Sequence, residues 1–222
     1  MHAKILVAGV SVVALLGACT TTDPYSSTPR RNNTGTGAIA GALGGAVLGY
    51  LTNTSNSEEG RKNALIGAGI GALGGAAVGA YMDRQQRDLE AELSGSGVGV
   101  ARQGDNLVLR MPSDVTFASN QSSISPGFYA TLDDVAAVLN RYDQSIVDII
   151  GHADSDGAED YNLNLSRQRA SSVAQYLVSR NVLADRLYVD GRGETQPVAT
   201  NATAQGKAQN RRVEILIRPF RG

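Results

Sequence analysis

The second half of the chain carries short apolar runs separated by turn residues, a pattern that predicts β-strands. Six runs have strand length, at residues 98–103, 107–111, 115–117, 146–150, 187–190 and 212–217. Gly104-Asp105-Asn106 joins the first two runs and is typical of a hairpin turn. We therefore expect the sheet to begin with an antiparallel pair of strands.

Between these runs, apolar residues recur at helical spacing. One predicted helix face consists of residues three and four positions apart: Phe128, Leu132, Val135, Leu139 and Tyr142. Ser125-Pro126 is typical of the start of that helix, and a second helix is predicted over residues 163–179. The alternation of strands and helices predicts an α/β sandwich with helices on one face of a mixed sheet.

The first half contains an internal repeat rich in glycine. Residues 37–49 and 67–79 align at an offset of thirty residues, and each carries glycine at every fourth position. On a helix this spacing forms a stripe along which two backbones approach closely, as in membrane helix pairs. A polar turn at 52–63 separates the repeats, so we expect a helical hairpin over residues 37–82. A flexible linker is the alternative, but both repeats lack Ser and Pro and keep a strict period.

The N-terminus has the pattern of a secretory signal over residues 1–18. Lys4 is followed by an apolar stretch at 5–16 and by small residues before Cys19, the single cysteine of the chain. Leu16-Gly17-Ala18-Cys19 resembles the bacterial lipobox, which implies that Cys19 is acylated and anchors the protein in a membrane. By the same resemblance, an aspartate directly after the cysteine would favour retention in the inner membrane. The chain has Thr20 there, which implies the outer membrane. An ordinary signal peptide with a chance cysteine is the alternative.

Composition completes the predicted organisation. Residues 19–36 are polar and contain two prolines, so we expect a flexible tether there. Residues 83–96 are charged and predict a helical stalk, and residues 97–222 form the C-terminal domain. The net charge of −1 leaves no basic surface for nucleic acid, and we expect no metal or cofactor.

Asp154 and Arg169 lie at the two ends of a loop that runs into the second predicted helix. A fixed carboxylate and a fixed guanidinium suit a zwitterion, because the first binds an ammonium and the second binds a carboxylate bidentately. An ordinary ion pair between the two residues is the alternative that spacing alone favours.

Three sequence stretches together resemble the OmpA-like peptidoglycan-binding domain shared by OmpA, Pal and MotB. They are G-H-x-D-x-x-G from Gly151, Y-N-x-x-L-S-x-x-R-A from Tyr161, and N-R-R-V-E-I from Asn210, and their spacing matches over more than a hundred residues. The resemblance implies a βαβαβ-β fold. The glycine repeats ahead of such a domain resemble YiaD-type lipoproteins.

The same resemblance implies a ligand and a set of residues that bind it. The ligand is the free end of meso-diaminopimelate in the peptidoglycan stem peptide, which carries an amine and a carboxylate. The implied binding residues are Asp154, Arg169, Asn162, Arg211, Asn120 and Asp156. Lysine in place of diaminopimelate would leave the arginine without its anionic partner.

Two positions depart from the family pattern. Asp156 replaces a hydroxyl residue that is common in the family, and we expect it to add negative charge beside the ligand. Ala118 stands where many members have Asp after Phe. Neither departure changes the Asp154 and Arg169 pair.

Hydrolytic and metal-dependent functions are disfavoured by the motifs. His152, Asp154 and Ser166 invite comparison with a catalytic triad, but the chain has no G-x-S-x-G motif. Asp154 and Glu159 could be taken as the paired acids of a glycosidase, but no further motif supports this role. A calcium-binding loop counted from Asp154 would need Gly at its sixth position and Glu at its twelfth, where the chain has Glu159 and Leu165. We therefore expect a non-enzymatic protein.

The sequence as a whole predicts an outer-membrane lipoprotein that tethers the membrane to meso-diaminopimelate-type peptidoglycan, with its C-terminal domain in the periplasm. An alternative is a membrane oligomer, pore or assembly factor driven by the glycine zipper, which peptidoglycan binding would only position. Homo-oligomerisation through the glycine faces is expected in that case.

Overall fold

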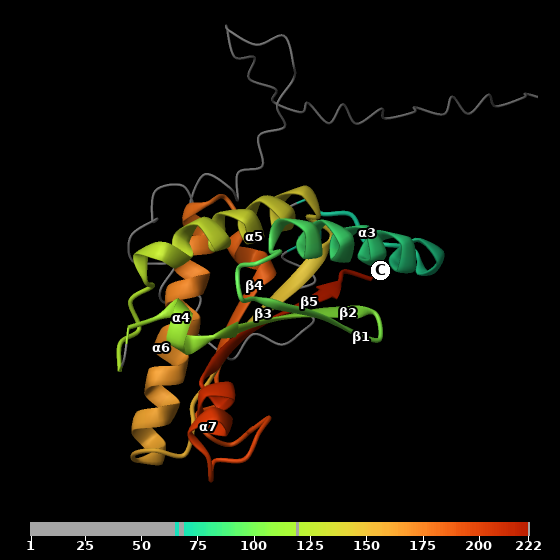
Figure 1. Cartoon of the computed structure of the whole chain (residues 1–222). Helices are drawn as coiled ribbons and strands as arrows, with labels where there is room; N and C mark the ends of the chain where they lie inside the picture. The colour runs from blue at the N-terminus through green and yellow to red at the C-terminus, as the bar shows by residue number, and fades with distance from the viewer. Residues whose placement is uncertain (1–64, 67–68, 119, 222) are drawn as a thin grey trace, which may run out of the picture. The chain divides into compact units, whose positions relative to one another are not determined.

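The computed structural model describes residues 65–66, 69–118 and 120–221 (Figure 1). These residues form a five-stranded sheet in the order β1-β2-β5-β3-β4. Its strands are β1 (Gly99–Gln103), β2 (Asn106–Pro112), β3 (Ser145–His152), β4 (Leu187–Gly191) and β5 (Arg212–Pro219). Only β3 and β4 pair in parallel among the described strands, and the other neighbours are antiparallel. The mixed sheet confirms the predicted fold class.

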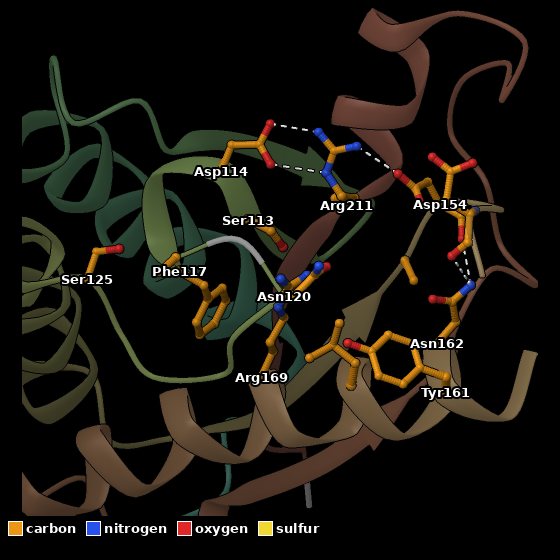
Figure 2. A pocket seen from close by; sticks show the side chains of 14 residues that line it. Ser113, Asp114, Phe117, Asn120, Ser125, Asp154, Tyr161, Asn162, Arg169 and Arg211 are labelled. Atoms are coloured by element: carbon orange, nitrogen blue, oxygen red, sulfur yellow. Dashed lines mark hydrogen bonds and ion pairs between the residues drawn. The ribbon is translucent and has the colours of Figure 1, made fainter. Parts of the chain in front are cut away.

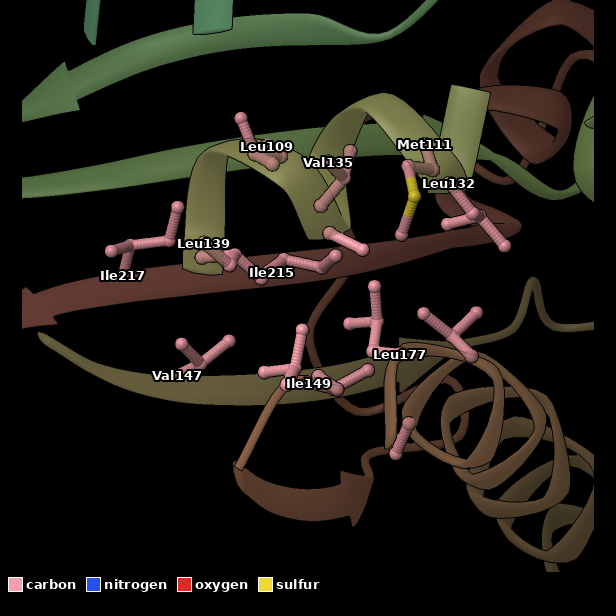
Figure 3. Packing of buried hydrophobic residues seen from close by; sticks show 14 of the residues in the cluster. Leu109, Met111, Leu132, Val135, Leu139, Val147, Ile149, Leu177, Ile215 and Ile217 are labelled. Atoms are coloured by element: carbon pink, nitrogen blue, oxygen red, sulfur yellow. The ribbon is translucent and has the colours of Figure 1, made fainter. Parts of the chain in front are cut away.

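Helices cover one face of this sheet. They are α3 (Gly75–Glu92), α5 (Tyr129–Arg141) and α6 (Glu159–Ser179), accompanied by the short α4 (Ser113–Thr116) and α7 (Ala204–Asn210) and the 3-10 turns η1 (Pro126–Phe128) and η2 (Ala184–Arg186). Alternate residues of β5, such as Val213, Ile215 and Ile217, are buried in the same cluster as Leu132, Leu139 and Leu177 of the helices (Figure 3). The predicted inward face of α5 is therefore confirmed.

Glycine allows α6 to lie unusually close to the sheet. A Cβ atom added to Gly151 of β3 would lie 2.0 Å from the carbonyl oxygen of Ser166 in α6. One added to Gly191 of β4 would lie 2.5 Å from the backbone nitrogen of Arg167. Both positions therefore require glycine, and this close contact fixes α6 beside the end of β3.

The charged segment predicted as a stalk is instead part of the fold. Met82 and Leu89 of α3 and its C-cap residue Leu93 are buried in the main core. Polar contacts add to this packing, since the backbone nitrogen of Gln144 donates to the Tyr81 hydroxyl at 2.8 Å and Arg141 pairs with Asp88 at 2.8 Å. The charged residues occupy the solvent side of an amphipathic helix.

The glycine repeats are only partly within the described residues. Residues 37–49 lie outside them, so the first arm of the hairpin stays a prediction. In the second repeat the helix begins at Gly75, and residues 69–74 are not helical. Gly69 has a φ of +81°, and the nitrogen of Leu73 donates to the carbonyl of Phe220 at 2.8 Å. The prediction of a helix through the whole repeat is therefore wrong here, because glycine gives the helix little stability against such contacts.

No helix in the described part of the chain is long and apolar enough to cross a membrane.

Three local predictions differ from the structure. The run at 115–117 is not a strand, because Ser113–Thr116 form the helical turn α4, in which the hydroxyl of Thr116 donates to the carbonyl of Pro112 at 2.8 Å. Helix α6 begins at Glu159, four residues before its predicted start. Helix α7 was not predicted, because its polar sequence has no apolar periodicity.

Arg186 is a buried cation that holds η2 against the end of α5. Its side chain is 1% exposed, and it donates to four acceptors. The acceptors are the carbonyls of Ser145, Leu139 and Tyr142 and the hydroxyl of Ser145, at 2.7–2.9 Å. Every nitrogen of the guanidinium is therefore bonded to protein, which offsets the cost of burying its charge.

Candidate functional site

A polar pocket of about 670 Å³ lies where α4, the β3–α6 loop, α6 and the start of β5 meet (Figure 2). Its lining residues are Ser113, Asp114, Phe117, Ala118, Asn120, Ser125, Ala153, Asp154, Asp156, Tyr161, Asn162, Leu165, Arg169 and Arg211. All six residues assigned from the sequence line this one pocket, although they come from separate parts of the chain. Cys19 lies outside the described residues.

Arg169 forms the cationic wall of the pocket. It lies on α6, is 5% exposed, and stacks over Phe117 with 5.3 Å between the guanidinium carbon and the ring centre. Its Nε donates to the carbonyl of Gln121 at 3.0 Å, and it forms no ion pair with any described residue. Burial lowers the pKa of Arg169, opposed first by the charge of Asp114. An arginine keeps its charge even so, and its Nη atoms therefore line the pocket as a cation without a direct anionic partner among the described residues.

Asp154 forms the anionic wall and is 6% exposed. Its Oδ1 accepts from the backbone nitrogen of Asp156 at 3.1 Å, and its Oδ2 accepts from Nη1 of Arg211 at 2.7 Å. The ion pair that spacing alone favours, between Asp154 and Arg169, is therefore not formed. The partner of Asp154 is instead Arg211, which lies between α7 and β5.

Arg211 joins two carboxylates across the mouth of the pocket (Figure 2). Its Nε and Nη2 donate to the two oxygens of Asp114 at 3.1 and 2.9 Å, while its Nη1 reaches Asp154. The hydrogen bond to Asp114, followed by the one to Asp154, raises the pKa of Arg211. All three nitrogen atoms are thus engaged by protein carboxylates.

Asp114 was not found from the sequence. It follows Pro112 and Ser113 in a stretch predicted to lead into a strand, and only the turn of α4 brings its side chain to the pocket. A lone acidic residue 97 positions from its arginine leaves no signal in one sequence.

Asn162 shapes the loop that carries Asp154. It is buried, and its Nδ2 lies 3.1 Å from the carbonyl of Asp154, 3.0 Å from that of Asp156 and 2.8 Å from Oε2 of Glu194. One amide thus holds both ends of the turn, and Gly157, with a φ of +99°, completes it.

Asp156 does not present an isolated negative charge to the pocket. Its Oδ1 lies 2.6 Å from Nζ of Lys207 on α7, so the charge predicted to lie beside the ligand is paired. Asn120 also lines the pocket and has a φ of 54°, a backbone conformation that asparagine tolerates better than most residues. Ala118 provides no carboxylate at the position where many family members have aspartate.

His152 and Ser166 do not assemble a catalytic triad with Asp154. Both nitrogens of His152 are buried without a hydrogen bond in the described structure, and Nε2 is 3.9 Å from Glu214. Burial, and then the charge of Arg212, lower the pKa of His152 to about 4. The Ser166 hydroxyl is used structurally, since it donates to the carbonyl of Leu163 and accepts from the nitrogen of Gly193. The described residues contain no cluster suited to a metal ion.

The mixed sheet and the pocket beside the β3–α6 loop define an OmpA-like α/β domain. Residues 116–211 match the OmpA family, and residues 1–83 match the YMGG-like Gly-zipper. Probable lipoprotein YiaD of Escherichia coli (strain K12) is 44% identical over 215 residues, which cover 97% of each chain. The chain therefore belongs to the OmpA family, with an N-terminal glycine zipper, as the resemblance implied. This family is non-enzymatic, which confirms the expectation that the chain is no enzyme.

Two further relatives match the C-terminal domain. Peptidoglycan-binding protein ArfA of Mycobacterium tuberculosis is 42% identical over 103 residues, 46% of this chain and 32% of ArfA. The cell wall anchor of the T6SS from Pseudomonas aeruginosa is 34% identical with a TM-score of 0.56, covering 62% of this chain and 99% of that structure.

Proposed function

We propose that this protein is a lipid-anchored tether that binds peptidoglycan through the free end of meso-diaminopimelate. The observation that carries the proposal is the pairing of charges in one pocket. Arg169 presents Nη atoms that make no ion pair with a described residue, and Asp154 lines the same pocket. A ligand that brings both a carboxylate and an ammonium satisfies both sides.

The carboxylate of the ligand binds Arg169. A buried guanidinium with one backbone acceptor gains strongly from a bidentate anion, since charge-assisted hydrogen bonds are the stronger class. The stacking of Phe117 fixes the plane of the guanidinium and so pre-organises it. The ammonium of the ligand binds on the side of Asp154.

Two relatives support a cell-wall ligand. ArfA is named a peptidoglycan-binding protein, and the structure from Pseudomonas aeruginosa is that of a cell wall anchor. YiaD, which matches nearly the whole chain, is named a probable lipoprotein. Acylation of Cys19 in the outer membrane, with the C-terminal domain in the periplasm, then links membrane to wall.

The test is co-sedimentation of the full chain with purified sacculi. We expect wild type to sediment with sacculi that contain meso-diaminopimelate and much less with sacculi that contain lysine. Asp154→Asn and Arg169→Gln should each abolish most of the binding. Arg180→Gln is the matched control, since Arg180 lies at the end of the same helix but is about half exposed and pairs with Asp133.

Equal binding of wild type, Asp154→Asn and Arg169→Gln would overturn the assigned site. Equal binding to both kinds of sacculi would overturn the assigned ligand. Circular dichroism of each variant separates loss of binding from loss of fold.

The glycine-zipper match over residues 1–83 supports a second candidate, a membrane oligomer or assembly factor positioned by the wall. Cysteine substitutions along the glycine positions of the first repeat should then give crosslinked oligomers in membranes. Those oligomers should vanish when Gly41 and Gly45 become leucine, because the larger side chain prevents close helix contact.

A further inference from the structure

We infer that Asp114 is a specificity residue of the pocket, because it cancels the charge of Arg211 and so leaves Asp154 anionic toward an incoming ammonium. The inference rests on the proposed function. It adds a residue of α4 that neither the motifs nor the position of the binding loop reveals.

Five charged residues line the pocket, and their pairing sets the charge on each side of it. Asp156 is paired with Lys207, so that pair is neutral. Arg169 is a cation without an ion-pair partner among the described residues. The remaining charges, Asp114, Asp154 and Arg211, form one cluster in which two carboxylates share a single guanidinium.

That cluster carries a net charge of −1 only because Asp114 is present. Without it, Arg211 and Asp154 would be a neutral ion pair at 2.7 Å, with Oδ1 of Asp154 already bonded to a backbone nitrogen. A neutral pair has little attraction for an ammonium compared with a net anion. With Asp114, the cluster at −1 and Arg169 at +1 together match a zwitterion.

The geometry shows that Arg211 is committed to Asp114. Two of its nitrogens bond the two oxygens of Asp114, whereas one nitrogen bonds Asp154. A bidentate arginine–carboxylate pair is the more specific of the two arrangements. Arg211 therefore gives Asp154 one hydrogen bond, while its charge is offset by Asp114, and the backbone nitrogen of Asp156 bonds the other oxygen of Asp154.

A pair of ligands and a set of variants test this inference. The ligands are the tripeptide L-Ala-γ-D-Glu-meso-diaminopimelate and the same peptide acetylated on the free-end amine. Binding to the full chain is measured by titration calorimetry. Wild type should prefer the free amine by at least about tenfold, since the acetylated form lacks the ammonium.

Asp114→Asn should weaken binding of the free-amine peptide about tenfold and leave binding of the acetylated peptide nearly unchanged. The double variant Asp114→Asn/Arg211→Gln restores a net charge of −1 through Asp154 alone. It should therefore recover much of the lost affinity. A purely structural role of Asp114 in holding Arg211 predicts the opposite, since removing both partners would not restore the loop.

Asp83→Asn is the matched control. Asp83 is 58% exposed and pairs with Arg102, as Asp114 is 53% exposed and pairs with Arg211, but it lies on α3 and does not line the pocket. This variant should bind both peptides as wild type does. Thermal unfolding of Asp114→Asn and Asp83→Asn should stay close to that of wild type, because both carboxylates are more than half exposed.

The possible failures are distinguishable. If wild type binds neither peptide, both the proposed function and this inference are overturned. If wild type prefers the free amine but Asp114→Asn binds it equally well, only the inference is overturned. The same holds if the double variant binds no better than Asp114→Asn alone.

Discussion

Arg186 and Arg169 are both almost completely buried, yet they differ in the number of hydrogen bonds that they donate to protein acceptors. Arg186 donates to four protein acceptors at the junction of α5, β3 and η2. Arg169 donates to one carbonyl and otherwise faces the pocket. A buried cation costs free energy unless it is bonded, so Arg186 stabilises the fold while Arg169 leaves bonding capacity for a ligand.

The difference also shows why burial alone does not identify a site. Burial lowers the pKa of both arginines, as expected for a charge removed from water. Only the count of bonded nitrogens separates them. Replacing each arginine in turn tests this contrast.

Arg186→Met should lower the free energy of unfolding by at least about 3 kcal/mol, because the carbonyls of Ser145 and Leu139 lose buried hydrogen bonds and that of Tyr142 loses one of its two side-chain donors. Urea unfolding followed by circular dichroism measures the change. Arg180→Met should alter stability by less than about 0.5 kcal/mol, because Arg180 is exposed. A mild effect of Arg186→Met would mean that the four bonds contribute little.

Arg169→Met should show the reverse behaviour. It leaves one backbone carbonyl without its donor but removes a buried charge, so the stability should change by no more than about 1 kcal/mol. Affinity for the free-amine tripeptide should fall at least about a hundredfold, measured by calorimetry, because the carboxylate loses its cation. A large loss of stability would place Arg169 in the same class as Arg186.

His152 extends the contrast to a buried base that can lose its proton. Its pKa is lowered to about 4 in the folded protein from an ordinary value of 6.5, so the unfolded state binds more protons between these values. Stability is therefore fully present above pH 6.5 and falls as the pH drops toward 4. We expect a loss of about 2 kcal/mol from about pH 7 to about pH 5.

Urea unfolding at several pH values measures this slope, and the matched variant His152→Gln should flatten it over the same range. An unchanged slope in His152→Gln would assign the pH dependence to other groups. Arg169 has no such response, because an arginine stays charged at these pH values.

The smallest effect is stabilisation by ligand. At ten times its dissociation constant, the free-amine tripeptide should raise the free energy of unfolding by about 1.4 kcal/mol. Thermal unfolding should show the shift in wild type and in Arg186→Met, but not in Arg169→Met. If Arg169→Met still showed the shift, the ligand would not depend on Arg169 for binding.

Periodic segments of the fold could be predicted from the sequence, while contact-dependent ones could not. The helix that carries Leu132 and Leu139 was predicted because its apolar residues repeat at helical spacing. Helix α4 was missed because four residues have no period, and backbone contacts to Pro112 and Arg211 hold them. Residues 69–74 were misassigned because glycine spacing alone does not stabilise a helix.

Most residues of the candidate site could be predicted from the sequence, but the hydrogen bonds between them could not. The family motifs placed Asp154 and Arg169 in one pocket. The bond from Arg211 to Asp154 joins residues 57 positions apart, and its direction depends on where β5 begins. Asp114 has no motif at all, so only the three-dimensional arrangement brings it into the site.

The packing of α3 against the core has a mechanical consequence for a chain held at its N-terminus. Tension along the chain would act first on Leu65, which is buried with Ile146 and Phe220, then on Leu73, whose nitrogen donates to the carbonyl of Phe220, and then on α3. The buried side chains of Met82, Leu89 and Leu93 must be pulled out before the load reaches β1. We therefore expect the segment from Leu65 through α3 to detach before β1, and the pocket is lined by no residue of that segment.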